Sequence, residues 1–195
     1  MSPTTGFIEE GLAAIGDTLD GAVARADLHL RPETVTKGAA RRVRATLRLL
    51  ETLLRRLLVL MAAELTLAPV RERAGDKPAS GARRGQRGFT LLPVMGGDLS
   101  RLAGLDRVRR KPGWNWTTTG LLLDRIGRLR QLTENPAPAA RRMARLLARL
   151  KASRAPRPVA FAQGGLHRHG HQLALIAGIL PQMIGEALSD WYDTS

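Results

Sequence analysis

Three histidines stand close together near the C-terminal end of the chain: His167, His169 and His171, separated by Arg168 and Gly170. Imidazole is a common ligand of zinc, copper and nickel, which makes this run the sharpest metal-binding pattern in the sequence. In an extended chain all three rings would share one face, whereas in a helix His169 would point away from the other two. Because no carboxylate lies within ten residues of the run, we interpret it as an exposed helix start and expect no bound metal or cofactor.

Two carboxylates, Asp17 and Asp20, lie one helical turn apart and have the residue type of an acid–base pair. We interpret them as part of the exposed surface of an acidic helix, because catalysis would also require a pocket around them. The chain has no cysteine, no Gly-x4-Gly-Lys-Ser/Thr phosphate loop and no Gly-x-Ser-x-Gly nucleophile motif. The sequence therefore favours a protein that is not an enzyme.

Positive charge is the strongest remaining signal, with a formal net charge of +14. Residues 1–36 carry two basic and six acidic side chains, whereas residues 37–185 carry 29 basic and eight acidic ones. Such segregation favours an anionic partner for the middle of the chain. Codon bias is an alternative explanation, because 27 of the 31 cations are arginine.

Two basic segments stand out because they lack apolar periodicity. Residues 71–88, rich in Gly, Ala, Arg, Pro and Ser, are expected to form a disordered basic linker. Residues 107–116 are expected to form a basic loop that contains two tryptophans. Arginine pairs with phosphate, and indole rings stack on unpaired bases. The candidate nucleic-acid-binding residues are therefore Arg83, Arg84, Arg87, Arg107, Arg109, Arg110, Lys111, Trp114 and Trp116.

The most regular apolar pattern predicts a long helix over residues 33–67. Its apolar residues alternate steps of four and three and form one seam. The seam consists of Val43, Leu47, Leu50, Leu54, Leu57 and Met61. Arg41, Arg44, Arg48 and Arg55 lie on another face, where Glu51 is placed to pair with Arg55.

Apolar residues at helical spacing predict four further helices, over residues 5–28, 117–133, 139–151 and 168–191. The middle two, separated by Asn135-Pro136, are expected to form an antiparallel hairpin, and Pro181 is expected to kink or restart the last helix. The predicted fold class is all-α: a helical bundle or helical hairpins around one long amphipathic helix, with disordered basic linkers. The expected organisation is an N-terminal helical hairpin (1–68), a flexible basic linker (69–97) and a C-terminal helical region (98–195).

The sequence predicts a cytoplasmic protein without a transmembrane segment. Residues 1–11 lack the basic start of a secretory signal. The longest uninterrupted apolar run, residues 57–63, is seven residues, against the roughly 20 that span a bilayer.

These features lead to one preferred function and one alternative. The preferred function is a non-enzymatic basic helical protein that contacts the nucleic-acid backbone without strong sequence specificity. The alternative is a structural or adaptor protein that uses the seam to form a homo-oligomer, or to dock on a protein partner or on the inner membrane surface. We also expect the acidic first helix to fold back on the basic middle and compete with the anionic partner, so that deletion of residues 1–31 would strengthen anion binding.

Overall fold

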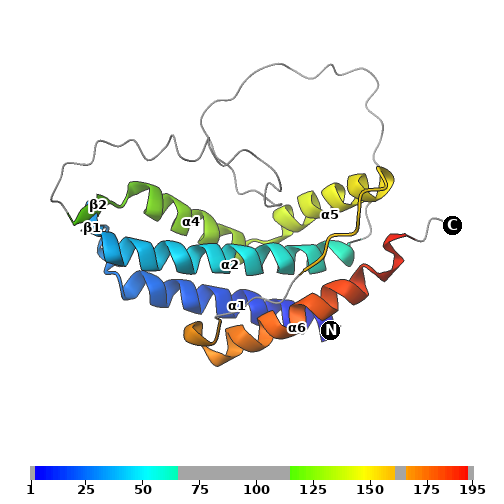
Figure 1. Ribbon diagram of the computed structural model, residues 1–195, viewed down its shortest axis with the longest axis horizontal. Coiled ribbons are helices and arrows are strands. Elements are labelled where there is room, and N and C mark those ends of the chain that lie inside the picture. Colours follow the sequence, from blue (N-terminus) through cyan, green and yellow to red (C-terminus); the bar gives the residue numbers. More distant parts are fainter. Residues whose placement is uncertain (1–2, 66–114, 161–165, 193–195) are drawn as a thin grey trace, which may run out of the picture.

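The computed structural model describes residues 3–65, 115–160 and 166–192 of the chain (Figure 1). In this part of the chain the fold is mainly helical, which confirms the predicted all-α class. The α-helices are α1 (Pro3–Ala24), α2 (Lys37–Ala63), α4 (Gly120–Glu134), α5 (Ala137–Ala152) and α6 (His171–Ala187). The shorter elements are the 3₁₀ turns η1 (Leu28–Leu30), η2 (Leu166–His169) and η3 (Ser189–Trp191), and the strands β1 (Thr34–Thr36) and β2 (Trp116–Thr118).

The centre of the fold is α2, a helix of 27 residues that is about 40 Å long at ~1.5 Å per residue. It begins at Lys37, four residues after the predicted start, because the sequence Thr-Val-Thr before it forms β1. β-branched residues favour extended backbone. The Thr36 hydroxyl then caps the helix by accepting a hydrogen bond from the Ala39 N–H at 3.2 Å.

The predicted apolar seam of α2 lies inside the protein. Five of its six residues are buried, and the sixth, Met61, is partly buried. The helices α1, α4, α5 and α6 all pack against α2. Full burial of one leucine side chain stabilises a protein by about 2 kcal/mol. The seam is therefore the main source of cohesion, and the chain's own helices cover it.

The predicted hairpin between the helices over residues 117–133 and 139–151 is wrong. α4 and α5 follow one another along the same side of α2 (Figure 1). Each is about half as long as α2, with 15 and 16 residues. Each of the two helices has a single apolar stripe to bury, and each buries it against a different part of α2. The chain therefore passes through Asn135 and Pro136 without reversing its direction.

A short antiparallel ribbon joins two parts of the chain that lie far apart in sequence. β1 pairs with β2 in the register Thr34↔Thr118, Val35↔Thr117 and Thr36↔Trp116. The buried Thr119 hydroxyl extends this link by donating to the carbonyl oxygens of Pro32 and Glu33. Thr119 is also the N-cap residue of α4, but its side chain makes no capping hydrogen bond to that helix.

Two helix ends differ from the sequence-based expectation. α1 ends at Ala24, and the turn η1 follows between Asp27 and Arg31, which both adopt left-handed backbone conformations. α6 is shorter than predicted because 3₁₀ turns stand at both of its ends. It continues through Pro181 as one element and does not restart there.

One hydrophobic core unites the described helices. Buried residues from α1 and α2 belong to the same cluster as buried residues from α4, α5 and α6. The N-terminal and C-terminal helical regions therefore pack together. None of the described helices is both long enough and apolar enough to cross a lipid bilayer.

Gly11 allows α1 to approach α2 closely. A methyl group at this position would lie 2.9 Å and 3.0 Å from the two Cδ atoms of Leu57, which is fully buried. A methyl group at Gly16, in the same helix, would have no neighbouring atom within 4 Å. Gly11 is thus a packing residue, whereas Gly16 only lowers the helix propensity of α1.

The replacements Gly11→Ala and Gly16→Ala should therefore change stability in opposite directions. Both gain roughly 0.5–1 kcal/mol of helix propensity, but only the methyl group at Gly11 overpacks the core, at a cost of about 1–3 kcal/mol. Urea unfolding followed by circular dichroism measures the difference. Equal stabilisation of both variants would show that α1 and α2 are not tightly packed at Gly11.

Candidate functional site

Trp116, the predicted site residue that the structure places, lies at the beginning of α2. It is the cross-strand partner of Thr36, the residue that caps α2. The Asn115 carbonyl oxygen also accepts a hydrogen bond from the Lys37 N–H at 2.8 Å. Outer residues of the ribbon are exposed, whereas Val35 is buried. The Trp116 side chain is therefore held on the solvent side, where it is 51% exposed.

A row of cations begins beside this tryptophan and follows α2. Lys37, Arg41, Arg44 and Arg48 alternate steps of four, three and four residues, so they lie on one face of the helix. All four side chains are exposed. Within the part of the chain that the structure describes, no carboxylate forms an ion pair with them. We call these four side chains the cation row.

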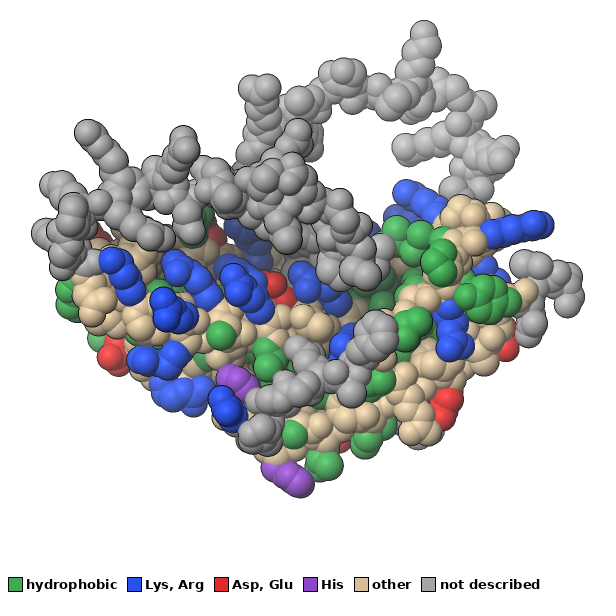
Figure 2. Space-filling model, viewed as in Figure 1, with side chains coloured by type: hydrophobic (Ala, Val, Ile, Leu, Met, Phe, Trp, Pro, Cys, Tyr) green, Lys and Arg blue, Asp and Glu red, His purple; other side chains and the backbone are tan. Residues whose placement is uncertain are grey.

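The face that contains the cation row is strongly basic as a whole. Between residues 37 and 50 the chain has five cations and no carboxylate. Figure 2 shows lysine and arginine side chains gathered over the end of the molecule where Figure 1 places the ribbon and the first half of α2. The sequence places Arg41, Arg44 and Arg48 on one face of the predicted helix but does not distinguish this face as a binding site. The signal it lacked was the position of Trp116, since the pairing of two distant segments brings the ring to the row.

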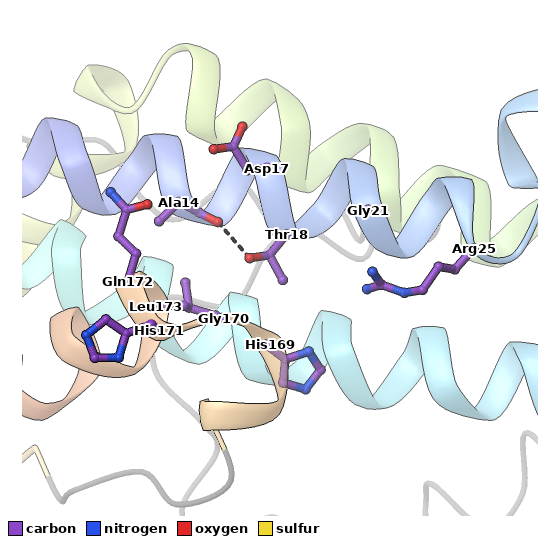
Figure 3. A pocket seen from close by; sticks show the side chains of 10 residues that line it. All are labelled: Ala14, Asp17, Thr18, Gly21, Arg25, His169, Gly170, His171, Gln172 and Leu173. Carbon is purple, nitrogen blue, oxygen red and sulfur yellow. Dashed lines mark hydrogen bonds between the residues drawn. The ribbon is translucent and has the colours of Figure 1, made fainter.

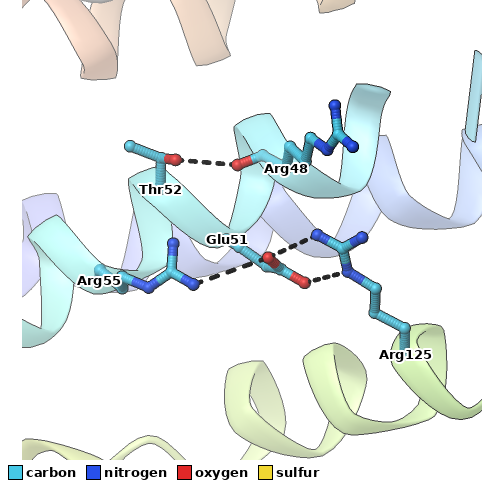
Figure 4. A network of polar contacts seen from close by, with 5 residues as sticks. All are labelled: Arg48, Glu51, Thr52, Arg55 and Arg125. Carbon is cyan, nitrogen blue, oxygen red and sulfur yellow. Dashed lines mark hydrogen bonds and ion pairs between the residues drawn. The ribbon is translucent and has the colours of Figure 1, made fainter. Parts of the chain in front are cut away.

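The row ends at Glu51, where a network of ion pairs begins (Figure 4). The Glu51 carboxylate accepts two hydrogen bonds from Arg125 of α4, at 2.5 Å from Nε and 2.7 Å from Nη2. Arg55 approaches the same carboxylate to 3.7 Å, as the spacing within α2 predicts. The Glu51 side chain is 13% exposed. One carboxylate thus serves two arginines and anchors α4 to α2.

The surroundings of this network shift the pKa values of its two arginines in opposite directions. Hydrogen bonding of Arg125 to the Glu51 carboxylate raises the pKa of Arg125, although burial opposes this effect. Burial lowers the pKa of Arg55, and the charge of Arg125 adds to this effect while Glu51 counteracts it. Burial also lowers the pKa of the adjacent Arg56. All three guanidinium groups remain charged near neutral pH, so this region keeps an excess of positive charge.

The structure describes the side chains of two residues of the histidine run, His169 and His171. His169 and His171 line a cleft between α1 and α6 (Figure 3). Among the described residues, no group of three potential ligands from His, Cys, Asp and Glu comes together. The His167 side chain lies outside the described residues.

The two carboxylates of the predicted acid–base pair point to different places. Asp20 forms an ion pair with Arg130 of α4. The Asp17 carboxylate points away from the histidines that line the same cleft (Figure 3). The pattern therefore corresponds to the surface of an acidic helix.

α1 folds onto α2, as the competition hypothesis expects, but it does so mainly through its apolar side. Ile15 and Leu19 of α1 are 1% exposed. Deletion of residues 1–31 would expose the core of the protein, so it is unsuitable as a test of competition. The ion pair between Asp20 and Arg130 is a direct contact between a carboxylate of α1 and a cation of another helix.

Most of the predicted nucleic-acid-binding residues lie outside the described residues. They are Arg83, Arg84, Arg87, Arg107, Arg109, Arg110, Lys111 and Trp114. Comparison of the chain with known family models, with curated proteins and with solved structures gives no match.

Removal of the Glu51 charge should destabilise the protein more than removal of the Asp20 charge. Glu51→Gln removes the negative charge that Glu51 contributes beside two partly buried arginines, Arg55 and Arg125, which costs about 1–2 kcal/mol after allowance for their partial exposure. Asp20→Asn breaks a pair whose side chains are 64% and 48% exposed, and this costs within about 0.5 kcal/mol. Urea unfolding measures both values. Equal losses would contradict the anchoring role of Glu51.

Proposed function

We propose that the chain binds the sugar-phosphate backbone of single-stranded nucleic acid without strong sequence specificity. The binding surface consists of Trp116 and the cation row. The observation that carries this proposal is the exposed indole at the start of a row of cations that have no carboxylate partner among the described residues. The cation row provides contacts for phosphate groups. The ring provides a platform for one unpaired base.

The dimensions of the surface suit an extended strand. Lys37 and Arg48 are 11 residues apart, which corresponds to about 16 Å along the helix axis. Neighbouring cations on the row are separated by about 5–6 Å at Cβ. Arginine binds phosphate oxygens through two parallel N–H groups. A single strand could therefore contact several phosphates in succession while one base stacks on Trp116.

The alternative function has less support from the geometry. An interfacial helix inserts a large apolar face into the membrane, but the apolar face of α2 is buried in the core. The same burial applies to dimerisation or docking through the seam. Leu50 and Leu54 are fully buried, so a partner would reach them only if other helices moved away.

The predicted basic loop would add to this surface. Arg109, Arg110 and Lys111 precede Trp116 by five to seven residues in sequence. Chain connectivity limits their distance from the ring to about 25 Å or less. We therefore retain these cations as additional phosphate contacts in the proposal.

The triple replacement Arg41→Gln, Arg44→Gln and Arg48→Gln should weaken binding of a labelled oligonucleotide at least tenfold at low salt. Loss of three phosphate contacts should also reduce the slope of log K against log salt by about 2 for a single strand. Fluorescence anisotropy at several salt concentrations measures both quantities. The matched control replaces Arg141, Arg142 and Arg145 on α5, which are also exposed. If both triple variants lose affinity equally, binding depends on net charge and the proposed surface is wrong.

Trp116→Ala separates stacking from electrostatics. Removal of one stacked base costs about 1–3 kcal/mol, which corresponds to a loss of roughly fivefold to 150-fold in affinity. The salt slope should stay unchanged, because no charge is removed. The same assay measures whether the cations of the predicted loop contribute to oligonucleotide affinity. The variant for this test is the triple replacement Arg109→Gln, Arg110→Gln and Lys111→Gln. Unchanged affinity of the Trp116 variant would exclude a stacking role for the ring.

A further inference from the structure

A cleft of about 370 Å³ lies between α1 and the beginning of α6, outside the proposed nucleic-acid surface (Figure 3). Arg25, which directly follows α1, and His169 from η2 point toward the same space from different walls. Thr18 and Gly21 of α1 also line the cleft. The proposed nucleic-acid binding makes no use of this cleft.

Arg25 directly follows the last residue of α1, and its side chain is exposed. Its guanidinium folds back over Gly21, so that a methyl group at Gly21 would lie 3.2 Å from Nη1 and 3.8 Å from Cζ. Within the described part of the chain, Arg25 has no carboxylate partner. The Thr18 hydroxyl donates a hydrogen bond to the Ala14 carbonyl oxygen at 2.8 Å. The cleft thus presents a guanidinium without a counter-ion.

His169 lies in surroundings that disfavour its protonated form. Burial lowers the pKa of His169, and the positive charges of Arg25 and Arg168 lower it further. The other ionisable side chains that line the cleft are Asp17, whose carboxylate points away, and His171. The Glu10 carboxylate accepts a hydrogen bond at 3.0 Å from Gln172, which also lines the cleft. An anion between Arg25 and His169 would offset the two repulsive charges. Protonation of His169 would then be coupled to anion binding.

The backbone at the end of the cleft is compatible with a negative charge. Gly170 precedes α6 with φ 122° and has no side chain that could cap the helix. The amide groups of the first turn therefore have no side-chain acceptor from the cap residue. His171, Gln172 and Leu173 of this turn line the cleft. This feature adds to the attraction that Arg25 and His169 provide.

We propose that the cleft binds one tetrahedral oxyanion, a phosphate-type group, between the Arg25 guanidinium and the His169 ring. The anion accepts hydrogen bonds from the guanidinium and from the protonated imidazole. Its affinity increases as the pH falls, because the bound anion raises the pKa of His169. The site does not depend on the proposed nucleic-acid surface, since it uses residues of α1, η2 and α6.

Sulfate is the best probe for the first test, because it remains a dianion between pH 5 and pH 8. The pKa of His169 is measured by NMR in the full chain, with sodium sulfate and with sodium chloride at equal ionic strength. Sulfate should raise this pKa, and the sulfate affinity should increase between pH 7.5 and pH 5.5. His29, outside the cleft, is the internal reference. A pKa of His169 that is the same in both salts would overturn the proposal.

Replacement of Arg25 tests the geometry of the site. Arg25→Gln should weaken sulfate binding about tenfold or more, since a charge-assisted pair is lost, and Arg25→Lys should retain part of the affinity. The control Arg31→Gln removes an exposed cation that does not line the cleft and should leave sulfate binding unchanged. Circular dichroism verifies that each variant is folded. Equal losses in the Arg25→Gln and Arg31→Gln variants would reduce the effect to net charge and contradict the proposed site.

Competition against bound sulfate shows which kind of phosphate compound the cleft accepts. Inorganic phosphate and a nucleoside 5′-monophosphate are each added at fixed pH, and the chemical shift of His169 is followed. Displacement of sulfate by both shows that a free phosphate group is sufficient. An oligonucleotide that binds the protein but leaves His169 unaffected would show that the two surfaces are independent, whereas failure of the nucleic-acid proposal alone would leave the sulfate response intact.

Discussion

The leucine seam of α2 is the constraint on which the rest of the fold depends. A helix about 40 Å long with an apolar stripe along its length is unstable in water until other helices cover that stripe. α1 and α6 cover one part of it, and α4 and α5 cover another part in succession. The arrangement explains why two helices that follow one another in sequence do not form a hairpin. A hairpin would cover only half of the length of α2.

The same constraint determines where charge is permitted. Because the seam occupies one side of α2, the opposite side faces solvent, and the cation row has the same alternation of four and three residues as the seam. Glu51, three residues after Arg48, stands where the row ends. It lies where α4 crosses α2, so its carboxylate is used to hold Arg125 and Arg55. The basic surface therefore ends where helix packing requires a counter-charge.

Periodicity was sufficient to predict the helices, but it could not predict their contacts. The seam, the helical class and the pairing of Glu51 with Arg55 follow from local spacing, which the sequence displays directly. The ribbon between Thr36 and Trp116, and the bond between Glu51 and Arg125, join residues more than 70 positions apart. Short β-branched segments such as Thr-Val-Thr and the one that ends in Thr118 resemble helix caps as much as strands. The candidate site combines both kinds of feature. The cation row follows from residue spacing within one helix, whereas Trp116 comes from a distant segment of the chain.

The basic surface of α2 could result from codon bias or from a function. The absence of carboxylates from this surface distinguishes the two explanations. Codon composition influences whether a cation is arginine or lysine, but it does not require that carboxylates be absent between Lys37 and Leu50. Like charges three and four residues apart destabilise a helix by a few tenths of a kcal/mol for each pair. Glutamate at one of these exposed positions would relieve that repulsion and would preserve helix propensity. The first half of α2 keeps the repulsion, and the adjoining buried leucines offset its cost. The absence of carboxylates from this stretch therefore supports the proposed anionic partner.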